Sequence, residues 1–447
     1  MNWPDPSRKA ALIAAALLVA AVVAAAFAIP TDDRYAVARA VRVDWPMVPE
    51  SVTRTNDGGY VIVGARRAMR VDADGGIVWR RLFPGDGFGR RSARAPSASY
   101  DAGVDLPDGG TLLCGTREMG SGDPEAPVTT AGLIARIDRA GAVVERRLVF
   151  PKGVRTYHSS YFHRCLAWAG GIALIGEADK FDSAARGTRR SFYWLVLLDA
   201  GGQLRWERLV PIATVGFDRP AAVVLPDGDL VLAKSGTGGP GSATDIVRID
   251  SGGKVRVHRS VPGRAIPVEP LGGRSDVAML AEGRERATLT ELGDGAGPAR
   301  AETFALGGFS VRRAYRAPEG ALVMIGYARR GLVRYTAVAE VAAHGLRESL
   351  VRSVEAAPWT DAIPTGRPDE FAVVGDAGAG GAHRALALAL VAPRRGKLFD
   401  AASEAAAVAV DQARVVLSDP LGFIAAAGAW LSDTRAADDG VARPKRS

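Results

Sequence analysis

Short apolar runs separated by glycine-rich turns recur along most of the chain. In the first copy, the apolar run at residues 60–64 follows an Asn-Asp-Gly-Gly turn at residues 56–59, and a second turn at residues 72–76 leads into a run that contains Trp79. Asp-Gly and Gly-Gly pairs supply the positive φ angles of tight hairpins, and β-branched runs suit buried strands. The pattern predicts a four-stranded antiparallel meander that takes roughly 45 to 60 residues per copy.

Four copies of this pattern are clear and three are weaker. The apolar second strands of the clear copies lie at residues 60–64, 111–115, 172–176 and 230–233, and the weaker copies are marked at residues 277–280, 321–326 and 371–375. A single meander cannot bury both of its faces, and stacking the copies in a closed ring protects their edges. We predict an all-β fold, a β-propeller of about seven blades over residues 41–401, with about six or eight blades as the alternatives.

The two hairpins of the repeat resemble those of secreted bacterial and archaeal β-propellers. In those repeats, an Asp-Gly-Gly turn precedes an apolar strand that ends in glycine, and a second aspartate- and glycine-containing turn precedes a strand with a tryptophan. The resemblance covers residues 50–260 and, more weakly, residues 309–391. It implies an extracytoplasmic propeller and no particular activity.

A fainter resemblance links the second hairpin to quinoprotein propellers and to the related scaffold of the outer-membrane assembly machinery. Trp79 and Trp206 match the tryptophan of that hairpin, whereas Glu145 and Val257 stand at the same position in two other copies. The threonine that precedes the glycine in those families is absent from these hairpins, and no cofactor ligands stand out. We therefore predict no cofactor.

The N-terminal segment has the pattern of an export signal. Arg8 and Lys9 precede an uninterrupted apolar run at residues 10–29. Basic residues before such a run hold its start in the cytoplasm and direct the following chain across the membrane, so residues 1–30 are predicted to be a signal peptide or a transmembrane anchor. Ala-Phe-Ala at residues 26–28 suits cleavage, whereas the run is long enough to cross about 30 Å of hydrocarbon. The domain is expected to be periplasmic or otherwise extracytoplasmic, and anchored in the cytoplasmic membrane if the segment is retained.

Near the C-terminus the strand pattern gives way to helical patterns. An alanine-rich stretch follows residue 401, and Asp419 with Pro420 is typical of an N-cap and first-turn proline that open the apolar stretch at residues 421–431. We predict a helical segment over residues 402–431 that docks on the propeller, with a membrane-surface or partner-binding helix as the alternative. Residues 432–447 are predicted to be a disordered tail.

The distribution of charge argues against one class of partner, nucleic acids. The chain has 57 Lys and Arg residues against 49 Asp and Glu, and the excess positive charge is spread along the sequence. Nucleic-acid binding is not expected, because it requires a basic patch or stripe.

The two cysteines are Cys114 and Cys165, which fall in neighbouring copies of the repeat. They form either one disulfide or two buried free thiols, since the sequence does not place their Cα atoms.

The first strand of each blade lines the central channel of a propeller, so the entries of these strands form the predicted ligand site. They are rich in arginine, which suits an anionic ligand or an acidic partner peptide. His158 and His163 would lie on opposite faces of a regular strand, which argues against a shared metal site. The candidate ligand-binding residues are Asp101, Tyr161, His163, Arg164, Arg219, Arg312, Arg313 and Asp361, and Glu50 and Glu269 stand at two further strand entries.

These patterns predict a non-catalytic propeller of the cell envelope that binds a protein partner or an anionic ligand. The sequence has no spacing typical of a catalytic triad, a metal site or a phosphate-binding loop. The alternative is a hydrolase or lyase that acts on an anionic polymer at the channel mouth. That alternative requires His163, Arg219, Arg312 and Asp361 to share one pocket.

Overall fold

The computed structural model describes most of the chain between residues 35 and 393. The predicted export segment (residues 1–30), helical segment (402–431) and tail (432–447) lie outside the described residues. Within the described part, every regular element is a β-strand, and no helix is long and apolar enough to cross a membrane. The described residues are 35–43, 45, 47–83, 98–119, 129–152, 157–182, 188–213, 219–236, 242–271, 277–282, 286–292, 298–306, 308–317, 320–330, 333–342, 345–350, 359–367, 370–376 and 386–393.

The described strands follow one another in antiparallel groups. They are β1 (Tyr35–Val43); β2 (Ser51–Arg54), β3 (Tyr60–Gly64), β4 (Arg67–Val71) and β5 (Ile77–Leu82); β6 (Ala98–Asp105), β7 (Thr111–Met119), β8 (Thr129–Ile137) and β9 (Val143–Val149); β10 (Tyr157–Trp168), β11 (Gly171–Asp182), β12 (Thr188–Leu198) and β13 (Leu204–Pro211); β14 (Ala221–Val224), β15 (Leu230–Ser235), β16 (Ala243–Ile249) and β17 (Val255–Pro262); β18 (Arg264–Pro270), β19 (Val277–Glu282), β20 (Arg286–Leu292) and β21 (Pro298–Ala305); β22 (Phe309–Arg316), β23 (Leu322–Arg330), β24 (Val333–Ala342) and β25 (Gly345–Leu350); and β26 (Trp359–Pro364), β27 (Phe371–Asp376) and β28 (Leu386–Pro393).

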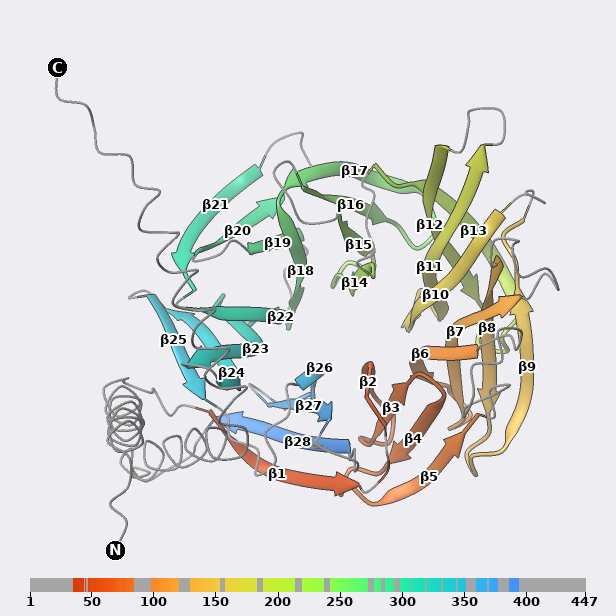
Figure 1. The fold of residues 1–447 in the computed structure, drawn as a ribbon, viewed down its shortest axis with the longest axis horizontal. Coiled ribbons are helices and arrows are strands. Elements are labelled where there is room, and N and C mark those ends of the chain that lie inside the picture. The colour runs from red at the N-terminus through yellow and green to blue at the C-terminus, as the bar shows by residue number, and fades with distance from the viewer. Residues whose placement is uncertain are drawn as a thin grey trace, which may run out of the picture.

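These strands form four-stranded meanders arranged in a ring around a central space (Figure 1). The sheets β2–β5 and β14–β17 are single meanders. Two eight-stranded sheets each join two meanders through a parallel contact, β8 with β10 and β18 with β22. The first strand of each meander faces the centre and the last lies at the rim. This is the architecture of a β-propeller, as the repeat predicts.

The hydrophobic core lies between neighbouring meanders. Ile62 of β3 packs with Leu388 of β28 on one side, whereas the adjacent Val61 packs with Leu113 of β7 on the other side. Alternate residues of a strand point to opposite faces, so a strand buried on both faces must be apolar throughout. This explains why the second strand of each repeat is an unbroken apolar run.

The N-terminal strand closes the ring. β1 pairs antiparallel with β28, with Tyr35 opposite Pro393 and Val43 opposite Leu386, and completes the sheet of β26, β27 and β28. The ordered ring thus includes residues before the predicted boundary at residue 41. A lone strand without the turns of the repeat carries no repeat signal in the sequence.

The two tryptophans of the second hairpin pack against the next meander. A Cβ atom added to Gly141 would lie 2.6 Å from Cβ of Trp79, and one added to Gly253 would lie 3.3 Å from the ring of Trp206. Both glycines are in turns and have positive φ. The tryptophan of one meander and the turn glycine of the next therefore form a recurrent contact between neighbours.

In three meanders, the aspartate of the first turn forms an ion pair with an arginine of the third strand. Arg70 of β4 pairs with Asp57 at 2.9 Å, and Arg248 of β16 pairs with Asp227 at 2.6 Å. Arg136 of β8 pairs with Asp108 at 2.5 Å. In the meander β10–β13, the turn has Ala169 in place of the aspartate, and Leu197 stands in the register of the arginine. The arginine is thus present where the turn aspartate is present, and both are replaced together.

We predict that Arg70→Met lowers the free energy of unfolding by about 3–5 kcal/mol, because it leaves the buried carboxylate of Asp105 without an ion-pair partner among the described residues. Arg70 bonds Asp105 at 2.8 Å, and both side chains are more than nine-tenths buried. The control is Arg136→Met, whose ion pair is partly exposed and should contribute about 1 kcal/mol or less. Chemical denaturation measures both values. Equal losses would show that burial does not set the strength of these pairs.

Candidate functional site

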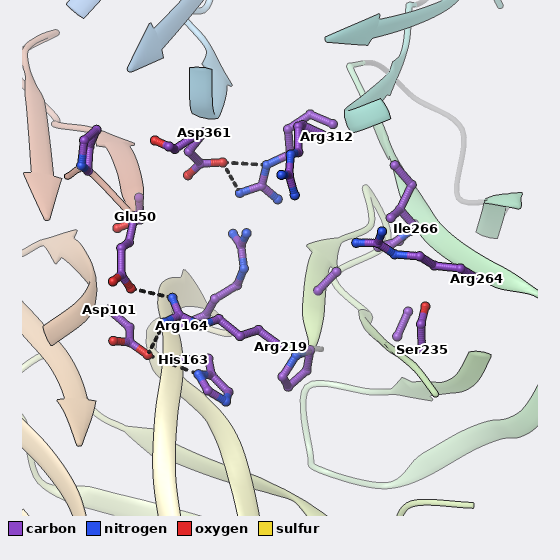
Figure 2. Close-up of a pocket in the computed structure, with 18 of the residues that line it drawn as sticks. Glu50, Asp101, His163, Arg164, Arg219, Ser235, Arg264, Ile266, Arg312 and Asp361 are labelled. Carbon is purple, nitrogen blue, oxygen red and sulfur yellow. Dashed lines mark hydrogen bonds and ion pairs between the residues drawn. The ribbon is translucent and has the colours of Figure 1, made fainter. Parts of the chain in front are cut away.

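A cavity of about 580 Å³ lies where the inner strands of the ring converge. Each of β2, β6, β10, β14, β18, β22 and β26 contributes at least one lining residue. Figure 2 shows charged side chains reaching into this space from several strands. The lining residues are Val48, Pro49, Glu50, Ser51, Asp101, His163, Arg164, Arg219, Pro220, Ala221, Ala233, Ser235, Arg264, Ala265, Ile266, Pro267, Arg312, Arg313, Tyr327, Thr360 and Asp361.

Most of the residues selected from the sequence meet at this cavity. The exception is Tyr161, whose ring packs 4.8 Å from the ring of His163 and whose hydroxyl lies 3.4 Å from Glu177. Glu269 does not line the cavity either, whereas Glu50 does. Sequence reasoning missed Arg264, which opens the meander whose repeat signal is faintest. The predicted residues that line the cavity are Asp101, His163, Arg164, Arg219, Arg312, Arg313 and Asp361.

Four inner strands carry a β-bulge at the cavity, and the extra residue of each bulge lines it. In β6, Tyr100 pairs with Gly115 and Ala102 with Cys114, which leaves Asp101 as the extra residue. The same break in register isolates His163 in β10, Arg312 in β22 and Thr360 in β26. A bulge bends the strand and re-aims a side chain. The bulges thus bring corresponding residues of four meanders to one cavity.

The glycine that follows the apolar run within the second strand permits the backbone of the inner strand to approach closely. A Cβ added to Gly115 would lie 2.0 Å from the carbonyl oxygen of Ser99, and one added to Gly176 would lie 1.8 Å from that of Tyr161. Gly326 stands in the same relation to Ser310. Each of these glycines pairs with the residue that precedes the bulge. The glycine that ends the apolar run of the repeat is therefore the sequence signal that marks these three bulges.

Glu50, Asp101, His163 and Arg219 form an acidic corner of the cavity. Arg219 bonds Oε2 of Glu50 at 2.5 Å and lies 3.7 Å from Oδ2 of Asp101. Burial raises the pKa of Glu50 above its ordinary value; Arg219 opposes this shift and Asp101 adds to it. The positive charge of Arg219 thus offsets the negative charges of two neighbouring carboxylates, Glu50 and Asp101.

His163 has a carboxylate near each ring nitrogen. Nδ1 lies 3.1 Å from Asp101 (Figure 2), and Nε2 lies 3.7 Å from Glu177. Glu177 is buried and paired with the buried Lys234 of the neighbouring meander. A neutral imidazole has a single N–H and can donate to one of these carboxylates only. His163 is thus held between a carboxylate of the cavity and a carboxylate of the core.

The arginine-rich side of the cavity holds more positive charge than its carboxylates balance. Arg313 donates from Nε and Nη2 to the same oxygen of Asp361, at 2.7 and 2.5 Å, while the other oxygen of Asp361 accepts the backbone N–H of Val52 at 3.1 Å. Arg312 stacks over the ring of Tyr327 at 5.2 Å. Five arginines and three carboxylates line the cavity in all.

Arg164 has no carboxylate within ion-pair distance among the described residues. Burial lowers the pKa of Arg164 to about 10; the neighbouring Arg313 contributes to this shift, and Asp361 and Glu269 oppose it. Figure 2 shows its side chain extending toward the middle of the cavity. Two guanidinium groups that lie close together in a partly buried site create a strong local attraction for an anion.

The cysteines lie in the core beside this cavity. Cys114 and Cys165 are both buried free thiols, and Sγ of Cys165 donates to the backbone oxygen of Leu112 at 3.6 Å. Burial raises the pKa of Cys114 well above its ordinary value, and Cys165 adds to this effect. The described residues contain no group of three or more His, Cys, Asp or Glu side chains placed to hold a metal ion. The side chain of His158 is outside the described part of the structure.

Comparison with known proteins identifies similar folds and no family. No protein-family model and no curated protein sequence matches the chain. The polysaccharide lyase Uly1 is 9% identical over 80% of this chain and 99% of its own, with a TM-score of 0.47. The Dos1 propeller is 9% identical over 77% and 78%, with a TM-score of 0.43. A Bacteroides caccae protein of unknown function is 15% identical over 66% and 78%, with a TM-score of 0.31. These similarities concern architecture and assign neither ligand nor activity.

We predict that Gly176→Ala lowers the free energy of unfolding by about 2 kcal/mol or more, because the new methyl group has no room against the backbone of β10. The bulge at His163 must then shift, so the NMR signals of His163 should change as well. The matched control is Gly201→Ala in an exposed turn, where the nearest atom to a Cβ is a side-chain oxygen at 3.3 Å. An unchanged stability of Gly176→Ala would refute the proposed role of this glycine.

Proposed function

We propose that the protein is a non-catalytic binding propeller of the cell envelope whose ligand site is the cavity at the channel mouth. In this proposal, the meanders are seven blades, with β1 supplying the outer strand of the last one. The apolar run at residues 10–29, with Arg8 and Lys9 before it, exports the domain or anchors it at the membrane. The site then faces the periplasm or another extracytoplasmic space.

The observation that carries the proposal is the guanidinium of Arg164. Arg219 is engaged by Glu50, and Arg313 is engaged by Asp361. Arg164 has no such carboxylate partner among the described residues and lies close to another cation. Burial of this cation costs free energy in the empty protein, and the carboxylates of Asp361 and Glu269 offset that cost without forming an ion pair with it. An anionic group of a small ligand or of a protein partner, placed between Arg164 and Arg312, would supply a directly bonded counter-charge.

We predict that Arg164→Gln raises the dissociation constant of an anion at least about tenfold, because a charge-assisted hydrogen bond is lost. Isothermal titration of the full-length protein with sulfate, phosphate and citrate tests this. Arg80→Gln, on the exposed face of β5, is the control for loss of one positive charge. Equal anion affinity in both proteins would rule the site out.

The geometry of His163 supports one alternative, a hydrolase or lyase that acts on an anionic polymer. His163 lies between Asp101 and Glu177, in the same cavity as Arg219, Arg312 and Asp361. A histidine oriented by a carboxylate is a general base in many enzymes. Product formation from a panel of anionic polysaccharides, abolished in His163→Ala, would establish this alternative. Binding without turnover by the wild type would exclude it for the polymers tested.

A further inference from the structure

The register of the last sheet fixes the side of the ring at which the N-terminal segment joins it. Tyr35 opens β1, which is the outer strand of the sheet that β26, β27 and β28 form. Across this sheet, the beginning of β1 is level with Pro364, the last residue of the inner strand β26. The cavity residue Asp361 lies near the beginning of β26 instead. The chain therefore enters the ring on the side away from the cavity.

The first and second turns of the meanders lie on that same side, which we call the turn face. Strands of a meander alternate in direction, so the inner strand ends on the turn face and the outer strand begins there. In the meander β2–β5, for example, the register sets Ile77 at the start of β5 level with Arg54 at the end of β2. Leu82, at the other end of β5, is level with Gly64, on the side of the cavity.

An exposed aliphatic residue opens the outer strand in four consecutive meanders. Each follows the second turn directly and is between 37% and 46% exposed. Single exposed apolar residues are normal on protein surfaces, whereas a repeated group on one face is typical of an interaction surface. The four residues are Ile77 of β5, Val143 of β9, Leu204 of β13 and Val255 of β17.

The predicted anchor holds the turn face close to the membrane. Residues 30–34 separate the apolar run at residues 10–29 from Tyr35. Five residues span at most about 18 Å when fully extended. If the run stays in the bilayer, this short connection gives the turn face a high effective concentration at the lipid surface. Contacts that would be too weak to bind a free protein are then sufficient to orient a tethered one.

We propose that the turn face rests on the membrane in the anchored protein and that the cavity opens away from the lipid. The four aliphatic residues that open the outer strands contact the interfacial region of the bilayer. The inference rests on the membrane anchoring that the proposed function includes. It also narrows the ligand of the cavity, because an anion must then arrive from the aqueous phase and an anionic lipid headgroup is excluded.

A zwitterionic lipid surface is sufficient for this contact. The second turns expose both signs of charge, with Asp72 and Asp74 in one meander and Arg139 and Lys254 in two others. Anionic lipids attract segments in which basic residues cluster. The mixed charge of these turns provides no such cluster, so the aliphatic side chains supply the attraction. The partner is therefore a phosphatidylcholine-like surface.

The test compares two pairs of labelled positions on the full-length protein, with residues 1–30 retained, in phosphatidylcholine nanodiscs. A fluorescent label is placed through Ile77→Cys or Leu82→Cys at the two ends of β5, and through Val143→Cys or Phe150→Cys at the two ends of β9. All four residues are exposed, whereas the native Cys114 and Cys165 are buried. A lipid with a nitroxide near its headgroup quenches labels that touch the bilayer.

We expect quenching at Ile77→Cys and Val143→Cys to be at least about threefold stronger than at Leu82→Cys and Phe150→Cys, because the interfacial region is only about 5–10 Å deep. Equal quenching at both ends of each strand would show that the ring stands on its rim and would overturn the inference. Stronger quenching at Leu82→Cys and Phe150→Cys would overturn it as well, because the cavity would then face the lipid.

Titration of citrate into the same nanodiscs distinguishes this inference from the proposed function. We expect the dissociation constant of citrate to change less than about threefold when phosphatidylglycerol replaces part of the phosphatidylcholine, because screened surface charge acts over only about 10 Å. A larger loss would show that lipid reaches the cavity and would overturn the inference. Citrate binding with equal quenching refutes the orientation alone. The expected quenching without citrate binding refutes the anion site alone.

Discussion

The structure depends on the burial of both faces of every meander. The second strand of each repeat is apolar on consecutive residues, as Val61 and Ile62 show, and these side chains pack against different neighbours. No meander can satisfy this requirement alone, so the chain must return to its start. The pairing of β1 with β28 achieves this return. The hydrogen bond from Val52 of β2 to Asp361 of β26 then joins the inner strands of the first and last described meanders at the cavity, so closing the ring also assembles the site.

The same repeat that forms the core places the charged residues. Because a glycine follows the apolar run within the second strand, the inner backbone can approach closely and bulge at Asp101, His163 and Arg312. A regular strand would turn alternate residues toward the two packed faces. The bulge instead frees one residue per strand from this alternation, and the ring directs that residue to the centre. The residues that pack between meanders and the residues that line the cavity are therefore different residues of the same strands.

Much of the fold and part of the site can be predicted from the sequence. The turns and apolar runs indicate the meanders, and the entries of the inner strands include Asp101, His163 and Arg312. Arg264 was not predicted as a site residue, because its meander lacks the clear glycine-rich turns that locate the strands of the other copies. Tyr161 lies before the bulge, where the side chain meets Glu177 instead of the cavity. The hydrogen bond from Val52 to Asp361 joins residues that are more than 300 positions apart and that only the closure of the ring brings together, so it has no local signal in the sequence.

The charges of the cavity divide into those that the fold uses and those that it does not. Arg313 and Asp361 hold two meanders together, and Arg219 compensates Glu50 and Asp101. Arg164 lacks such a use: it lies close to Arg313, and the carboxylates of Asp361 and Glu269 attract it without forming an ion pair among the described residues. Local rules of packing and polar satisfaction are usually broken where a protein binds or reacts. Because Arg164 lines the same cavity as four further arginines, an anionic ligand bound there would account for its position.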